Sequence, residues 1–187
     1  MLAELLSHDG VRESCELRAR FGFMAIHGGS LERGTAEVAR RAAELAGASL
    51  YAVEQPERLH WHVPSHLYDP AASAKLRTFL DHVEVVVSVH GYGREGFWTR
   101  LLVGGADRDL AQRSATRMRP HLEGFEVIDD VEAIPRALRG VHPRNPCNLT
   151  RSGGIQLELP PRVRGLGPRG KPRHMEALIR GLAAVFV

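Results

Sequence analysis

Two histidines and two glutamates stand where a folded chain could bring them together. His27 and His90 each close an apolar stretch and are followed at once by glycine, and Glu158 lies one residue from the end of a third apolar stretch. A buried strand gains nothing in packing from a titratable side chain, so these positions indicate a site. Glu32 follows His27 across a glycine-containing loop that can fold back toward the imidazole. Two histidines and a glutamate are a ligand set of catalytic zinc, which keeps a fourth position for water.

The pattern therefore predicts a Zn²⁺ ion held by His27, Glu32 and His90. Glu158 would not be a ligand but the general base that takes a proton from the water that zinc activates. Each residue also has a plainer interpretation. A histidine at a strand end is often a hydrogen-bonded structural residue, and Glu32 could be a solvated charge favoured near a helix start. It is the combination at several strand ends that favours a metal site.

The elements that must position these residues alternate between strand and helix. Such alternation predicts one α/β domain over residues 1–187, with a mixed, mostly parallel sheet and helices on both faces. In such sheets ligands bind beyond the carboxyl ends of the strands, where the candidate side chains would gather. The expected strands cover 21–27, 50–53, 59–63, 84–90, 97–103, 125–128 and 155–159, and the expected helices cover 35–45, 69–83, 107–122 and 175–187.

Composition excludes several classes of protein. The chain has 187 residues, 43% hydrophobic and 25% charged, and no apolar run of bilayer length, so a membrane protein is not expected. Its start lacks the basic and apolar regions of a secretory signal. Two cysteines, Cys15 and Cys147, cannot form a disulfide framework. We expect a cytoplasmic protein that is a monomer or a weak homo-oligomer and has no membrane partner.

The net charge of +3 is unevenly distributed. Residues 151–187 hold seven arginines or lysines against two glutamates, so the rest of the chain is slightly acidic. A basic segment allows an alternative of another class, a nucleic-acid-binding protein without catalysis. Against it, Phe186 is the one aromatic residue among 151–187, so the bases would have little to stack on. That alternative would also leave the histidines and glutamates unexplained.

Three motifs in the same order carry a family resemblance. They read HGGSLERGTAE at 27–37, VSVHGY at 87–92 and NLTRSGGIQLEL at 148–159. With these motifs the chain resembles the poly-γ-glutamate hydrolases, a family that includes phage depolymerases and is distantly similar to zinc carboxypeptidases. The resemblance runs from about Phe21 to Arg162. It implies a carboxypeptidase-like fold, zinc on His27, Glu32 and His90, and hydrolysis of γ-glutamyl amide bonds with Glu158 as the catalytic carboxylate.

An acidic glutamyl substrate requires cationic and amide partners. Arg151 is the candidate to stabilise the oxyanion, and Arg162 and Asn148 are candidates to bind carboxylates, which a guanidinium matches with two hydrogen bonds. Tyr92 and His62 are further candidates to line the substrate pocket.

The segment after the third motif departs from the family. Residues 160–169 read PPRVRGLGPR, where the family usually continues with a small residue and a Gly-Leu-Arg-like stretch. The identity of the substrate is therefore open. A zinc amidase or deacylase of a small N-acyl amino acid or a cell-wall peptide is the alternative, and a relative that has lost catalysis is a further one.

Overall fold

The computed structural model describes residues 1–186 and contains one seven-stranded sheet. Along the sheet the order is β1-β3-β2-β4-β7-β5-β6. Neighbours among β3, β2, β4 and β7 are parallel, β6 is parallel to β5, and β1 and β5 run antiparallel to β3 and β7. The mixed, mostly parallel sheet is thus confirmed. The strands are β1 (Arg12–Glu16), β2 (Phe21–Gly29), β3 (Ser49–Gln55), β4 (Val85–Gly91), β5 (Arg100–Val103), β6 (Glu126–Ile128) and β7 (Gly154–Leu159).

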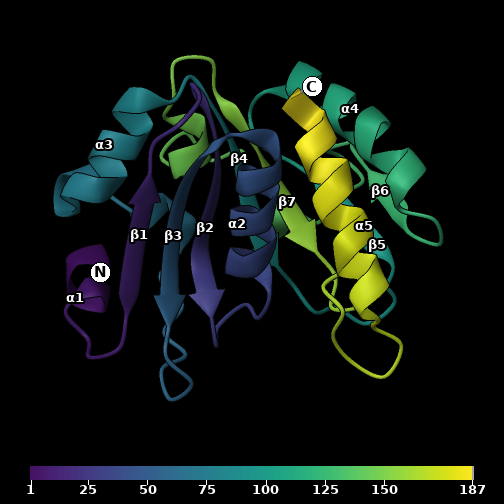
Figure 1. Ribbon diagram of the computed structural model, residues 1–187, viewed down its shortest axis with the longest axis horizontal. Helices are drawn as coiled ribbons and strands as arrows, with labels where there is room; N and C mark the ends of the chain where they lie inside the picture. The colour runs from purple at the N-terminus through teal and green to yellow at the C-terminus, as the bar shows by residue number, and fades with distance from the viewer. Residues whose placement is uncertain (187) are drawn as a thin grey trace.

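Helices cover both faces of the sheet, as expected. α2 (Thr35–Ala46), α4 (Arg108–Met118) and α5 (Pro172–Ala183) share one apolar core with the sheet, and α2 and α5 lie in front of it in Figure 1. α1 (Leu2–Leu6) and α3 (Ala74–His82) share a second core on the other face. None of the helices within residues 1–186 has the length and apolar character needed to cross a bilayer.

Several predicted elements have different bounds. The helix expected over 69–83 is divided, because Asp69 caps a short 3₁₀ turn and the Ser73 side chain accepts from Leu76 N to begin α3 afresh. The helix expected over 175–187 begins earlier, at Pro172, and Val187 lies outside the described residues. The 3₁₀ turns cover Ser65–Leu67, Pro70–Ala72, Arg119–His121, Arg136–Leu138, Pro146–Asn148 and Ala184–Phe186.

One predicted strand is wrong. Residues 59–63 form an irregular segment between Pro56 and Pro64, which restrict the backbone at both of its ends. His60 and His62 therefore do not lie on one face of a strand, where the predicted strand would have placed them. β1 and α1, in turn, were not expected from the sequence.

The parallel strands deliver their carboxyl ends to one edge of the sheet, and β2 is irregular just there. Ala25 pairs with Ala52 and Gly28 pairs with Glu54, so β2 uses three residue steps where β3 uses two. This extra residue is a β-bulge, which re-aims the neighbouring side chains. His27 lies within the bulge, and its direction is therefore set by this local irregularity.

Gly29 at the end of the bulge should be irreplaceable. Its φ is +73°, and a Cβ there would collide with the carbonyl oxygen of Gln55 on β3. Gly47, after α2, has a φ of +64° but no atom within 4 Å of such a Cβ. We expect Gly47→Ala to cost about 1 kcal/mol of backbone strain and Gly29→Ala about 3 kcal/mol or more. Thermal unfolding should then show a Tm loss of roughly 3 °C against roughly 10 °C. Equal losses would contradict the bulge geometry.

Candidate metal centre

The structure brings together the three residues predicted as ligands. His27 Nδ1 lies 2.8 Å from Glu32 Oε1 and 3.2 Å from His90 Nδ1, and His90 Nδ1 lies 3.6 Å from Glu32 Oε2. Both histidines are buried. Glu32 is held in place from β4, because its Oε2 also accepts a 2.8 Å hydrogen bond from the backbone N–H of Gly91.

The Nδ1 atoms of His27 and His90 face each other, and the hydrogen bonds of the Nε2 atoms bear on where each ring carries its proton. His27 Nε2 lies 2.8 Å from the carbonyl oxygen of Val63, which can only accept, so Nε2 carries the proton. His90 Nε2 lies 3.0 Å from Ser88 Oγ, a hydroxyl that can donate or accept. With its proton on Nε2, the neutral His27 ring presents the lone pair of Nδ1 toward the carboxylate of Glu32 and toward His90 Nδ1. A lone pair that faces a carboxylate is repelled by it unless a cation lies between them.

The donor set fits zinc by type and spacing. Donor atoms around a tetrahedral zinc lie roughly 3.3–3.5 Å apart, given bonds of about 2.0–2.2 Å. The contacts among His27, Glu32 and His90 range from 2.8 to 3.6 Å. Two imidazoles and one carboxylate would hold the ion and leave a coordination position free toward the cavity.

The electrostatics of these groups are those of a site built for positive charge. Burial alone would raise the pKa of Glu32, but the adjoining His90 and His27 outweigh it and hold this pKa well below its usual range. Burial opposes protonation of His27, yet the hydrogen bond and charge of Glu32 raise the pKa of that imidazole. A proton shared between His27 and Glu32 would thus supply positive charge at the place where a metal cation would bind.

Glu158 faces the cavity from β7, next to the metal centre. It pairs in register with His90 on β4 and is 5% exposed. Its Oε1 accepts a 2.9 Å hydrogen bond from Gln156 Nε2, and Gln156 Oε1 accepts a 2.7 Å bond from Asn145 Nδ2. Burial raises the pKa of Glu158 to about 7, with partial relief from the charge of His90. A carboxyl with this pKa is well matched to taking and returning a proton near neutral pH.

The raised pKa has a measurable consequence for stability. Because the folded state binds the Glu158 proton more tightly than the unfolded state, its stabilising contribution is lost as pH rises from about 4.5 to about 7. We expect Glu158→Gln to stabilise the zinc-free protein above pH 7, on the order of 3 kcal/mol, and to have little effect near pH 4.5. Denaturant unfolding across this range checks the prediction, with Glu44→Gln on the exposed face of α2 as the matched control. A Glu158→Gln gain that does not change with pH would contradict it.

His62 lies beside the centre and is an alternative to His90 as the imidazole ligand that joins His27 and Glu32. One ligand atom each from His27, Glu32 and His62 lie within 4.8 Å of one another, and the rings of His27 and His62 are 4.7 Å apart. His90 has the stronger claim, because it is buried on a strand and its Nδ1 contacts both partners directly. His62 is exposed on the irregular segment before Pro64. We assign His62 to the cavity wall, as the sequence predicts.

The cavity above the centre has a volume of about 810 Å³. Besides the four central residues it is walled by His62, Tyr92 and the segment 136–142, and Arg136 is the one arginine among the described residues that lines it. Tyr92 lines the cavity as predicted, but its hydroxyl donates a 2.6 Å hydrogen bond to the carbonyl of Arg100. Because the Tyr92 hydroxyl already donates to the backbone, a substrate in the cavity would contact the Tyr92 ring and not its hydroxyl.

Three of the predicted substrate contacts are not brought to this cavity. Arg151 is exposed before the amino end of β7, where the next residue, Ser152, bonds the carbonyl of Glu84 at the start of β4, so it cannot reach an oxyanion beside His90. The side-chain amide of Asn148 already bonds the backbone: it donates to the carbonyls of Gly140 and His142 and accepts from Ala106 N. Arg162 lines a different pocket. None of the three residues therefore lines the cavity at the metal centre, because strand ends are predictable from the sequence and loop paths are not.

Arg164 is a buried cation near the site that sequence analysis did not identify. It donates to the carbonyls of Arg33 and Tyr92 and packs over Gly91, where a Cβ would lie 2.6 Å from its Nη1. Burial lowers its pKa, while Glu32 and Glu158 counteract that effect. The absent side chain at Gly91 was the available signal, since it leaves room for a large neighbour. Arg136 and Asn145 carried no local signal.

Comparison with known proteins agrees with this geometry. The family model described as poly-gamma-glutamate hydrolase matches residues 4–169. Protein YndL of Bacillus subtilis is 31% identical over 138 residues, which cover 73% of this chain and 51% of YndL. The chain thus spans about half the length of the curated relatives it matches.

Solved structures share the fold. A zinc-free YndL superposes with a TM-score of 0.76 at 24% identity, covering 97% of this chain and 94% of the other. A bacteriophage poly-gamma-glutamate hydrolase gives 0.72 at 21% identity, covering 95% and 91%. A carboxypeptidase-type protein from Burkholderia mallei gives 0.56 at 6% identity, covering 98% and 64%. The carboxypeptidase-like fold expected from the motifs is confirmed.

Proposed function

Because the chain belongs to the poly-gamma-glutamate hydrolase family, we propose that it is a zinc-dependent hydrolase that cleaves γ-glutamyl amide bonds. The observation that carries the proposal is the meeting of His27 Nδ1, His90 Nδ1 and the Glu32 carboxylate within 3.6 Å, beside the buried acid Glu158. Two imidazole nitrogens and a carboxylate that converge in a buried site match the donors of a cation site. The zinc-free form in which YndL was solved supports zinc as the metal of this family.

Zinc bound by His27, Glu32 and His90 would supply Lewis acidity, lowering the pKa of a water molecule and polarising the scissile carbonyl. Glu158 accepts the proton of the attacking water and returns it to the leaving amine nitrogen. Burial raises the pKa of Glu158 above that of an exposed glutamate, which favours return of the proton to the leaving amine. The hydrogen bond from Gln156 keeps Oε1 of Glu158 fixed, leaving Oε2 to take the proton.

The cavity wall supplies the recognition of an acidic substrate. Arg136 is exposed, and no hydrogen bond or ion pair engages its guanidinium within residues 1–186, so it is available to bind an α-carboxylate. His66 and His142 stack at 4.8 Å on the same side of the cavity and add donors there. We assign to Arg136 the carboxylate-binding role at this cavity that the sequence had suggested for Arg162 and Asn148. Arg164 holds the loop of Arg33 and the end of β4 together as a positioning residue.

The test is hydrolysis by the zinc-loaded protein. Incubation with poly-γ-glutamate should release new amino termini, a chelator should stop the release, and added zinc should restore it. Metal analysis should find about one zinc per chain. Cleavage of N-acyl amino acids or cell-wall peptides with no cleavage of γ-glutamyl chains would replace the substrate assignment. A protein that binds no zinc when it is supplied would overturn the proposal.

A further inference from the structure

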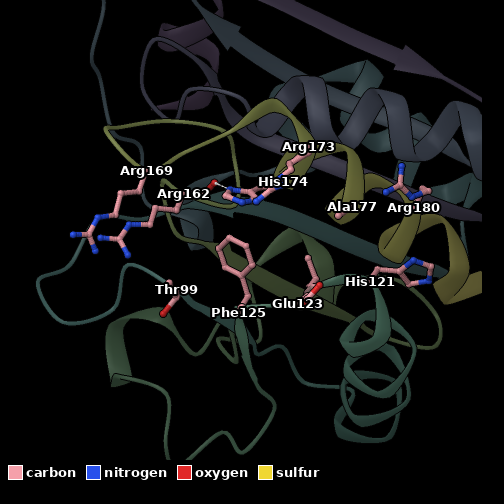
Figure 2. Close-up of a pocket in the computed structure, with 12 residues that line it drawn as sticks. Thr99, His121, Glu123, Phe125, Arg162, Arg169, Arg173, His174, Ala177 and Arg180 are labelled. Atoms are coloured by element: carbon pink, nitrogen blue, oxygen red, sulfur yellow. Dashed lines mark hydrogen bonds between the residues drawn. The ribbon is translucent and has the colours of Figure 1, made fainter.

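A second pocket lies away from the metal centre and gathers much of the positive charge of the C-terminal segment. It has a volume of about 590 Å³ and is lined from α5, from the turn at 121–125 before β6, and from the segment after β7. Figure 2 shows its side chains. The cationic or basic members are Arg162, Arg169, Arg173, Arg180, His121 and His174, against a single acidic residue, Glu123.

The arginines of this pocket have free guanidinium groups. No side-chain hydrogen bond or salt bridge within residues 1–186 engages Arg162, Arg169 or Arg173, whereas Arg41, on the neighbouring helix α2, is paired with Glu176. Arg169, Arg173 and Arg180 are also exposed. Gathering unpaired cations around one hollow costs free energy through mutual repulsion, and an anionic ligand would remove that cost.

The cations are spread along the pocket instead of converging on a point. In Figure 2, Arg162 and Arg169 lie toward one end, Arg180 and His121 toward the other, with His174 and Phe125 between them. A single small anion would be held by donors that converge on it. A row of separated guanidinium groups instead matches an extended chain that carries several carboxylates.

One end of the pocket, at Thr99 and Arg162, lies near the edge of the sheet that holds the metal centre. Leu102 on β5 pairs antiparallel with Glu158 on β7, so the start of β5, next to Thr99, reaches the edge where β7 ends. Arg162 follows Glu158 by four residues, which limits their Cα separation to roughly 14 Å. One polymer could therefore occupy both places.

We propose that this arginine pocket, defined by Arg162, Arg169, Arg173 and Arg180, is an exosite that binds carboxylates of a polyglutamyl chain at a distance from the bond that is cleaved. The inference rests on the proposed function and extends it to long, polyanionic substrates. Nucleic acid is the less suitable polyanion, because the one aromatic ring lining the pocket, Phe125, is packed edge-to-face with His174 at 5.2 Å and offers no free stacking platform.

The test separates binding from cleavage. Arg169→Gln with Arg180→Gln removes two exposed charges at opposite ends of the pocket, and Arg12→Gln with Arg77→Gln removes two exposed charges on β1 and α3 as the matched control. Binding of labelled poly-γ-glutamate to the zinc-free protein should weaken about tenfold, or about 1.4 kcal/mol, in the pocket variant and not in the control. The affinity of the wild-type chain should also fall with added salt. This readout needs no hydrolysis.

Kinetics give the second readout. With the zinc-loaded protein, the KM for the polymer should rise in the pocket variant, whereas the kcat and the KM for a γ-glutamyl dipeptide should stay unchanged. Wild-type binding of the polymer without cleavage would refute the proposed function and leave the exosite standing. Equal polymer affinity in the pocket and control variants would overturn the exosite. So would tight, pocket-dependent binding of single-stranded DNA without binding of poly-γ-glutamate.

Discussion

Glu158→Gln is expected to lower the kcat for γ-glutamyl hydrolysis by about a thousandfold while zinc remains bound, because removal of a positioned general base costs roughly 10²–10⁴ in rate. The amide has nearly the shape of the acid but cannot take a proton from water. Gln156 and Asn145, which lead to this position through hydrogen bonds, remain in place. Steady-state kinetics and metal analysis on the same sample check both parts of the prediction.

Glu44→Gln, on the solvent-facing side of α2, is the matched control and should keep full activity. If Glu158→Gln retained wild-type activity, Glu158 would not be the base. Loss of zinc together with activity would instead mean that Glu158 is a ligand.

His27→Ala is expected to abolish both zinc binding and hydrolysis. It removes one of three protein ligands, so the zinc affinity should fall by more than about 100-fold, beyond what the loss of a partner outside the ligand set costs. Chelator competition measures the affinity. Unfolding of the zinc-free variant shows whether the loss of the hydrogen bond to Val63 also weakens the fold.

Two further histidine variants separate the alternative ligand sets. His90→Ala should match His27→Ala, whereas His62→Ala should keep zinc and affect only the KM, because His62 is exposed on the cavity wall. His60→Ala, at an exposed position nearby, is the control. Zinc loss in His62→Ala with retention in His90→Ala would exchange the two assignments.

The strands of the sheet could be predicted where burial made them apolar on both faces. β2, β4 and β7 are buried, mostly apolar segments bounded by glycine, and each was located to within two residues. β1 was not predicted because its sequence, RESCE, is mostly polar. This composition reflects its place as a partly exposed strand at the edge of the sheet. The segment 59–63 has strand-like composition, but its contacts at the cavity mouth decide its path: the Gln55 side chain bonds the backbone of Trp61, and His27 Nε2 bonds the carbonyl of Val63.

The candidate site was predictable to the same extent as the strands. His27, His90 and Glu158 lie at strand ends, so a parallel sheet brings them together whatever the loops do. Arg151, Asn148 and Arg162 lie away from the cavity because the positions of such residues depend on tertiary contacts between distant loops. Arg164 reaches the site only by packing over Gly91, which is 73 residues earlier in the chain, and no local pattern encodes that contact.

The loop that walls the cavity is also linked by hydrogen bonds to Glu158, the proposed general base. Residues 136–142 face the substrate space, and the same loop carries Asn145, whose amide is linked through Gln156 to Glu158. Gly140, with a φ of +64°, lets the loop pass directly over the Gln156 side chain. If the proposed hydrolysis is correct, substrate preference and the pH dependence of the reaction should therefore be coupled through this loop. Redesigning the loop for a new substrate without restoring the Asn145 link would shift the acidity of Glu158 at the same time.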